Sequence, residues 1–203
     1  MKIILASASP RRVQVLWDAG IDFTTLPTEI DEARLAGEAV ADMVRRLAEA
    51  KARAAAQALS GLHPDSQATA AEPVIVIGAD TIVEIDGEAL GKPGSAAAAR
   101  AMLERLSGKD HRVHTGVAML RLPDGAARVE AECTEVSFAT LAPAEIESYV
   151  ATGEPLDKAG GYGIQGFGGR FVERIEGCYL NVVGLPLERV YRMLRELGWQ
   201  QRD

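Results

Sequence analysis

The chain has few cysteines and few aromatic residues: 2 of its 203 residues are cysteine and 5% are aromatic. Cys133 and Cys178 lie far apart and form no CxxC pair. This pattern excludes the dense disulfide framework that stabilises small secreted domains. Cysteine usage of this kind is typical of a reducing compartment, so we expect a cytoplasmic protein.

Long apolar runs are also missing. The N-terminus offers only four apolar residues, from Ile3 to Ala6, between Lys2 and Ser7. A signal peptide needs about 7 to 15 apolar residues, and a membrane span needs roughly 18 to 20. We therefore expect neither export nor a membrane partner.

Basic residues are too few for a nucleic-acid-binding surface. The chain carries 22 Lys and Arg against 29 Asp and Glu, which gives a net charge of −7. Tight, sequence-independent binding to nucleic acid requires many cations to neutralise phosphates. We expect no nucleic-acid partner, and any phosphate chemistry must use a few focused cations.

What is present is the composition of a folded protein, with 47% hydrophobic and 25% charged residues. The length suits one domain or a two-lobed one. Turn, cap and periodicity signals predict strands at 2–6, 74–77, 81–85, 112–122, 128–141 and 171–175, and helices from Ser9 to Gly20 and at 39–59, 95–108, 144–152 and 187–197. Helices and strands alternate, which favours an α/β or α+β fold.

Two connections carry further information. Asp86-Gly87 between two strand-like segments is typical of a hairpin, so the sheet should not be purely parallel. The polar, proline-containing stretch 61–73 is the best candidate for a mobile loop.

The segment Ser7 to Arg12 predicts an anion cradle. A strand runs into a helix start here, with Ser9 as N-cap and Pro10 in the first turn. Free N–H groups at a helix N-terminus, together with the guanidiniums of Arg11 and Arg12, suit phosphate oxygens. The alternative is a capped surface helix with two solvated arginines.

Lys51 falls on the apolar face of the long helix, in line with Val44, Leu47 and Ala55. A lysine can extend its ammonium to water from such a position. Lys51 lies well inside the helix, however, so a buried ammonium would need an anionic substrate or a carboxylate as partner. In the absence of ligand we expect Lys51→Met to keep or raise stability, because it replaces a charge on an apolar helix face with an apolar side chain of similar length.

Asp80 is the one carboxylate in the otherwise apolar run from Val74 to Val83. Burial penalises its charge unless a cation or a metal is near. Because sites form at the ends of buried strands, Asp80 is a candidate general base or metal ligand. The alternative is a structural aspartate in a turn after Gly78.

Six of the ten residues from Gly160 to Gly169 are glycine, which indicates close backbone approach. The segment Gly161 to Gly166 formally matches the dinucleotide fingerprint GxGxxG, but neither a strand before it nor a helix after it is expected, so we reject that interpretation. Gln165 could still donate and accept hydrogen bonds toward a base edge. His111 and His114 have no recognised ligand spacing, and solvated or structural roles are favoured.

Taken together, the motifs resemble those of the Maf family of nucleoside triphosphate pyrophosphatases over nearly the whole chain. The segments that carry the resemblance are Ala6 to Arg12, Leu47-Ala48 with Lys51-Ala52, Gly78 to Thr81, Gly91 to Pro93, Leu106 to Gly108, Glu154 to Gly166 and Val183 to Leu187. The resemblance implies an α/β, two-lobed fold of the Maf and inosine-triphosphatase type, formed by residues 1–203 as one domain, with a mixed central sheet and a cleft between lobes. It also implies a divalent cation, Mg²⁺ or Mn²⁺, a nucleoside triphosphate substrate, and a homodimer.

The resemblance assigns roles to individual residues. Asp80 becomes the proton acceptor for the attacking water, and Arg12, Lys51 and Lys92 offset charge on the triphosphate. Ser7, Ser9 and Arg11 contact phosphate or nucleotide. Glu32 is chosen as metal ligand along with Asp80, although Glu29 and Asp31 are equally acidic neighbours.

Three positions resemble the dTTP/UTP branch of the family: Arg11 after Pro10, Thr81 after Asp80, and Gln165. Arg11, Thr81 and Gln165 would then set base choice. The 7-methyl-GTP branch would show Tyr-Arg after the proline, Gln after the aspartate and Glu in place of Gln165. Cys178, where many relatives have serine, and the long stretch after Leu59 are departures that do not touch the proposed chemistry.

A competing hypothesis is a non-catalytic regulator that binds a nucleotide or a division partner through the same cradle. Asp80 argues against it, because a carboxylate facing a triphosphate without a metal would weaken binding.

Overall fold

The computed structural model describes residues 1–62 and 72–201. Its strands form a mixed sheet in the order β2-β1-β3-β5-β6-β7, with β4 pairing to β3. The β1–β3 pair is parallel, whereas β3–β4 and β6–β7 are antiparallel. The expected α/β fold with a mixed sheet is confirmed. The predicted mobile loop lies almost entirely outside the described residues.

The chain divides into two compact units. Unit 1 comprises Met1–Asp80, Thr115–Ala131 and Gly184–Asp203, and unit 2 comprises Thr81–His114 and Glu132–Val183. Strands β3 (Val74–Ile85), β5 (Asp110–Leu122) and β6 (Ala127–Phe138) contribute to both units.

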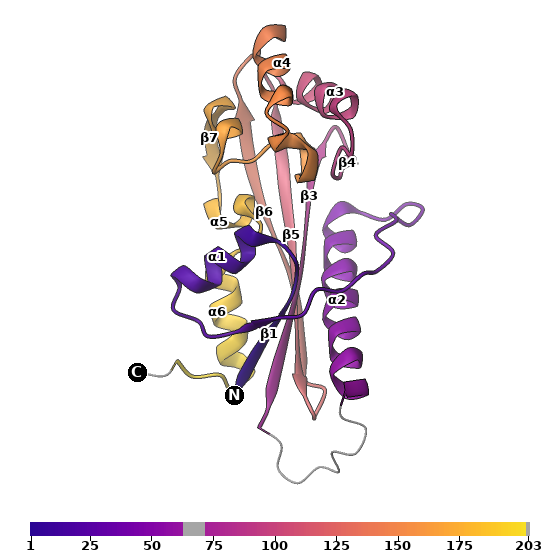
Figure 1. Ribbon diagram of the computed structural model, residues 1–203, viewed down its shortest axis with the longest axis vertical. Coiled ribbons are helices and arrows are strands. Elements are labelled where there is room, and N and C mark those ends of the chain that lie inside the picture. Colours follow the sequence, from indigo (N-terminus) through magenta and orange to yellow (C-terminus); the bar gives the residue numbers. More distant parts are fainter. Residues whose placement is uncertain (63–71, 202–203) are drawn as a thin grey trace. The chain divides into compact units, whose positions relative to one another are not determined.

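In unit 1, helices α2 and α6 lie on opposite sides of the strands (Figure 1). Besides the three shared strands, unit 1 consists of β1 (Lys2–Ala6), α1 (Pro10–Asp18), β2 (Thr24–Thr25), α2 (Val40–Leu62) and α6 (Leu187–Glu196). Small side chains, among them Ala48, Ala52 and Ala55, pack α2 against the sheet. The helix backbone therefore approaches β3 closely.

Unit 2 contains shorter elements around its own core. These are β4 (Glu88–Leu90), α3 (Ala96–Leu106), α4 (Pro143–Ala151), the 3-10 segments Glu154–Asp157, Ala159–Gly161 and Phe167–Phe171, β7 (Val172–Glu176) and α5 (Tyr179–Val183). The core includes Leu103, Phe138, Tyr149 and Phe171. The side chain of Ser95 accepts a hydrogen bond from the Ala98 amide at the start of α3, as its sequence predicts.

One difference from the sequence prediction concerns Gly78. The two strands expected at 74–77 and 81–85 form the single strand β3. A Cβ on Gly78 would lie 2.1 Å from the carbonyl oxygen of Ala48 and 2.7 Å from the Ala52 nitrogen. The glycine therefore permits close helix packing and does not interrupt the strand.

None of the helices within the described residues is both long enough and apolar enough to span a membrane.

Candidate functional site

The start of α1 follows directly on β1, as predicted, but the expected cap is absent. Ser9 occupies the N-cap position and its side chain makes no capping hydrogen bond. Its backbone amide donates instead to Ser7 Oγ at 3.2 Å. The predicted N-cap position is therefore correct, but the side-chain hydrogen bond expected of an N-cap serine is not formed. The Ser9 hydroxyl is thus not used by the helix.

Arg12 is a buried guanidinium and not a solvated one. Its Nε donates to the carbonyl oxygen of Gly184 at 2.8 Å, and its Nη1 donates to the carbonyl of Ala79 at 2.9 Å and to Ser7 Oγ at 3.2 Å. Burial lowers the pKa of Arg12 below its ordinary value, while the charge of Asp80 acts in the opposite direction. Arg12 therefore ties α1 to the residue before Asp80. The contact with Gly184 could not be predicted from the sequence, because it joins residues 172 positions apart and Gly184 stands out there only as part of the motif Val183 to Leu187.

The ammonium of Lys51 joins two carboxylates. Its Nζ lies 2.6 Å from Asp80 Oδ1 and 2.6 Å from Glu32 Oε1. The side chains of Lys51 and Asp80 are 12% and 9% exposed, and that of Glu32 is 53% exposed. The predicted carboxylate partner of Lys51 is thus Asp80, from the strand that α2 packs against.

Asp80 lies where the parallel pairing of β1 ends. The last paired residue of β1, Ala6, is level with Gly78, and Asp80 is two residues further along β3. Its second oxygen, Oδ2, is buried and has no hydrogen-bond partner among the residues that the structure describes. A buried carboxylate oxygen without a partner is costly, so this position suits a bound ligand.

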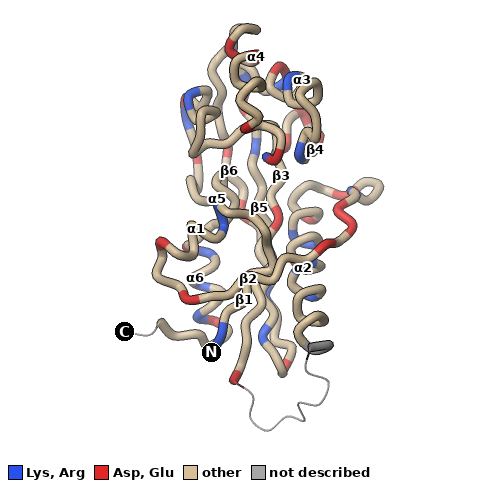
Figure 2. Tube along the Cα trace, viewed as in Figure 1, with Lys and Arg blue, Asp and Glu red and all other residues tan. Residues whose placement is uncertain are grey.

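Seven predicted site residues belong to unit 1: Ser7, Ser9, Arg11, Arg12, Glu32, Lys51 and Asp80. A hydrogen bond joins Arg12 to Ser7, and ion pairs join Lys51 to Asp80 and Glu32. Ser9 and Arg11 lie beside Pro10 at the start of α1, both half-buried. In Figure 2, acidic positions follow one another along the connector before α2, and Glu32 lies on this connector.

The other three residues belong to unit 2. Thr81 is its first residue and is half-buried, and Lys92 and Gln165 are exposed. The carbonyl of Gly91, next to Lys92, accepts a hydrogen bond from the Gly160 amide at 3.1 Å. This hydrogen bond joins the backbone next to Lys92 to the start of the glycine-rich segment. As expected, that segment has neither the strand nor the helix of a dinucleotide fold around it.

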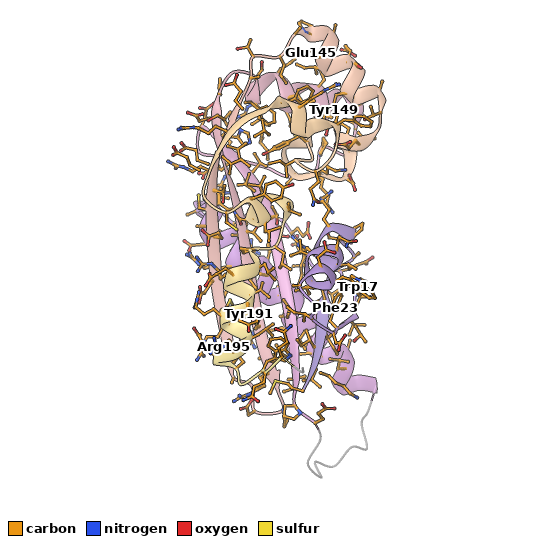
Figure 3. The ribbon with its side chains drawn as sticks, turned by 90° about the vertical axis from the view of Figure 1, so that its left-hand side faces the viewer. Trp17, Phe23, Glu145, Tyr149, Tyr191 and Arg195 are labelled. Carbon is orange, nitrogen blue, oxygen red and sulfur yellow. The ribbon has the colours of Figure 1, made fainter. Side chains whose placement is uncertain are left out.

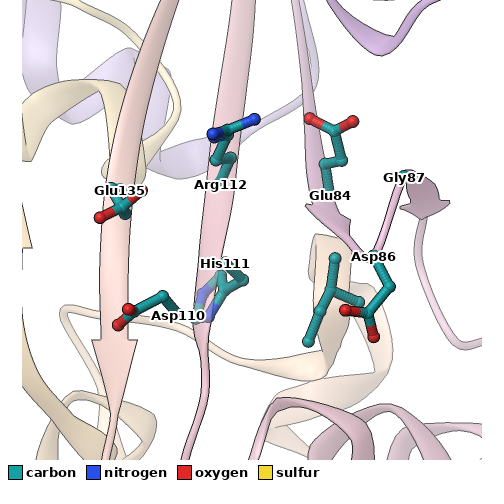
Figure 4. Close-up of a pocket in the computed structure, with 8 residues that line it drawn as sticks. Glu84, Asp86, Gly87, Asp110, His111, Arg112 and Glu135 are labelled. Atoms are coloured by element: carbon teal, nitrogen blue, oxygen red, sulfur yellow. The ribbon is translucent and has the colours of Figure 1, made fainter.

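Unit 2 also contains a hollow of about 230 Å³ that involves none of the predicted site residues (Figure 4). It is lined by Glu84, Ile85, Asp86, Gly87, Asp110, His111, Arg112 and Glu135. His111 bonds to the Tyr162 hydroxyl at 2.8 Å, and His114 to Glu84 Oε2 at 2.7 Å. Both histidines are buried, which supports the structural role.

The donor set of unit 1 fits a hard divalent cation. Mg²⁺ is commonly held by one or two carboxylates with substrate phosphates completing its shell. Asp80 and Glu32 are two such carboxylates, brought together by Lys51, and Asp80 Oδ2 is unpaired. Among residues 1–62 and 72–201 no cluster of three or more His, Cys, Asp or Glu could hold a metal by itself. The site therefore suits a cation that arrives with a phosphorylated substrate.

Comparison with known proteins finds relatives over nearly the whole chain. Residues 2–197 match the family model described as Maf-like protein. A dTTP/UTP pyrophosphatase of Moorella thermoacetica is 49% identical over 97% of this chain and 95% of its own length. A dTTP/UTP pyrophosphatase of Geobacter sp. is 50% identical over the same shares of the two chains. The solved Ham1 protein of Staphylococcus aureus matches with a TM-score of 0.40 and 14% identity over 68% of this chain and 72% of its own.

Proposed function

Because this chain belongs to the Maf family, we propose that it hydrolyses dTTP, UTP and related pyrimidine nucleoside triphosphates to the monophosphate and pyrophosphate. Relatives that carry the name dTTP/UTP pyrophosphatase match it at 42–50% identity over nearly the full length. The activity would remove unwanted nucleotides from the cellular pool. The family relationship further supports a single two-lobed Maf domain, a cytoplasmic location and a homodimer.

The observation that carries the proposal is the group formed by Lys51, Asp80 and Glu32. A structural ion pair needs one carboxylate for one ammonium, whereas here two carboxylates meet one lysine. One oxygen of Asp80 remains buried and unpaired. A buried carboxylate oxygen without a partner is costly in the isolated protein and useful when a ligand binds to it.

In the proposed mechanism, Asp80 accepts a proton from the water that attacks the α-phosphate. Lys51 fixes the carboxylate through Oδ1, so that Oδ2 is the oxygen left for ligand or proton. Asp80 and Glu32 would hold a divalent cation, which when bound offsets phosphate charge and acidifies a water molecule. Lys51 stabilises the negative charge that develops during the reaction.

The remaining residues bind and orient the nucleotide. Ser7, Ser9 and Arg11 supply donors to phosphate oxygens at the start of α1. Arg12, held by Ala79 and Gly184, contributes a fixed positive charge beside Asp80. Lys92 is proposed to contact the triphosphate, and Thr81 and Gln165 to set base choice together with Arg11.

Pyrophosphate release from a panel of nucleotides tests the function. With Mg²⁺ or Mn²⁺, dTTP and UTP should be hydrolysed with a higher kcat/KM than CTP, ATP, GTP and 7-methyl-GTP, because Gln165 can match the alternating acceptor and N–H edge of thymine and uracil. EDTA should abolish release. Highest activity on 7-methyl-GTP would contradict the branch and the role of Gln165, and nucleotide binding without release would favour a regulator.

A further inference from the structure

Gln165 is presented by a tight turn in the glycine-rich segment. The Gly166 amide donates to the Gly163 carbonyl at 3.2 Å, which places Ile164 and Gln165 at the two central positions. The Gln165 side chain is exposed, and the turn lies outside every helix and strand of unit 2. The orientation of the turn must therefore be fixed by contacts other than those of a regular helix or strand.

Two side chains outside the turn hold both of its ends. Tyr149, on α4 (Figure 3), accepts a hydrogen bond from the Gly163 amide at 3.1 Å and donates to Glu154 Oε1 at 2.9 Å. On the far side of the turn, Glu154 Oε2 accepts from the Phe167 amide at 2.9 Å, and Oε1 accepts from the Gly168 amide at 3.3 Å. The phenol and the carboxylate thus span the turn.

The turn lies directly against these two groups. A Cβ on Gly166 would be 2.4 Å from Glu154 Oε1, and one on Gly168 would be 2.7 Å from the Tyr149 hydroxyl. The glycines at these places therefore permit contact between the backbone and the two side chains. These contacts account for part of the close backbone approach that the glycine content predicts.

Glu154 remains a carboxylate in this position. Burial by itself would raise its pKa, but the hydrogen bonds from the Phe167 amide, Tyr149 and the Gly168 amide outweigh burial, so the pKa lies below its ordinary value. Its two oxygens receive three donors. A neutral amide in its place would turn an NH₂ group toward one of those donors.

We propose that Glu154, acting with Tyr149, is a positioning residue for base selection: it fixes the turn that carries Gln165 and so sets the angle at which Gln165 meets the base. The inference rests on the proposed function for the part played by Gln165. Neither Glu154 nor Tyr149 needs to touch the nucleotide. Their effect should appear in discrimination between bases.

The first test compares wild type with Glu154→Gln. The ratio of kcat/KM for dTTP to that for CTP should fall by roughly tenfold, the effect of one misplaced hydrogen-bonding group, while kcat on dTTP falls less than KM rises. Glu147→Gln is the matched control, because Glu147 is an exposed carboxylate on the same unit whose two oxygens pair with Arg100. Its ratio should equal that of wild type.

A second variant guards against misfolding. Tyr149→Phe keeps the buried ring, which packs at 5.2 Å from Phe171, and removes only the hydroxyl. It should shift the same ratio in the same direction. The double variant Glu154→Gln/Gln165→Ala should have the same dTTP-to-CTP ratio as Gln165→Ala alone, because Glu154 affects base choice only through Gln165.

An unchanged dTTP-to-CTP ratio in both Glu154→Gln and Tyr149→Phe, or additive losses in the double variant, would overturn the proposal. Hydrogen exchange provides a readout that does not depend on turnover. The Phe167 and Gly168 amides should exchange at least about tenfold faster in Glu154→Gln, and unchanged protection would also refute it. A wild-type protein that hydrolyses no nucleotide would contradict the proposed function instead, and exchange would then decide the positioning role.

Discussion

Asp80 has a chemical role that can be separated from its structural one. Asp80→Asn keeps the shape of the side chain but cannot accept a proton, so kcat should fall by roughly 100-fold or more. Nucleotide binding should change little. Pyrophosphate release and calorimetry with the unreacted nucleotide measure the two effects.

The control for this variant is Asp42→Asn, which removes an exposed carboxylate paired with Arg45 on α2. Its kcat should match wild type. Near-normal kcat in Asp80→Asn would remove Asp80 from the mechanism, and loss of folding would indicate a structural aspartate.

The structure reverses the stability expectation for Lys51→Met. Lys51 forms the direct ion pair with the buried Asp80 carboxylate, so its removal leaves Oδ1 without that partner, with the charge of Arg12 still nearby. Breaking such a pair from one side costs about 3 kcal/mol or more. Chemical denaturation should therefore show lower stability, along with lost activity.

Arg53→Met on the same helix is the matched comparison, because Arg53 is exposed and pairs with Glu49 four residues earlier. Its effect should stay below about 0.5 kcal/mol. Equal stability of Lys51→Met and wild type would show that other groups, Arg12 among them, compensate the charge of Asp80 without Lys51.

At the scale of elements, the packing of α2 on β3 depends on Gly78. Gly78→Ala introduces a Cβ that would lie 2.1 Å from backbone atoms of α2, where no side chain can yield. We expect destabilisation of at least about 1 to 3 kcal/mol, and reduced activity because α2 carries Lys51. In Gly91→Ala the new Cβ meets nothing within 4 Å, so its melting temperature should be close to that of wild type.

Strand β5 introduces a pH dependence through His111. Burial lowers the pKa of His111 from 6.5 to about 4, among Phe138 and Tyr162. Between these values the unfolded chain binds a proton that the folded chain does not, so stability is full above pH 6.5 and falls on acidification. The loss should approach about 3 kcal/mol near pH 4.

Denaturation at pH 7 and pH 4.5 measures this loss, with His111→Phe as reference. The variant should show a shallower decrease, whatever its absolute stability. The same decrease in both proteins would assign the acid sensitivity to other groups.

Helices, strands and single site residues could be predicted from the sequence where a pattern of neighbouring residues was enough to identify them. Lys51 and Asp80 stand out because each places a charge in an apolar pattern. Their pairing was not predictable, since the two residues are 29 positions apart and meet only because α2 crosses β3. For the same reason Glu32 could not be distinguished from Glu29 and Asp31 before its contact with Lys51 was seen.

At the scale of the whole molecule, the composition predicted a folded protein, and the length allowed either one domain or two lobes. Only the family resemblance favoured two lobes. Neither periodicity nor capping identifies a boundary inside one continuous strand. The first segment of unit 1 nevertheless ends at Asp80, and unit 2 begins at Thr81, within β3. The contacts of Glu154 were equally hidden, because they join a side chain to backbone amides about 13 residues later, at Phe167 and Gly168.

The connector between Leu26 and Ala39 contains no helix or strand. Two ion pairs attach it to α2: Glu32 with Lys51, and Glu38 with Arg46. Such an attachment should respond to ionic strength more than to acid, since the hydrogen bond from Arg46 lowers the pKa of Glu38 to about 2. At 1 M salt the screening length is only about 3 Å. Trypsin should therefore cleave after Arg34 faster in 1 M than in 0.05 M NaCl, relative to a free peptide of residues 27–39, and equal relative rates would show that the connector is held by other forces.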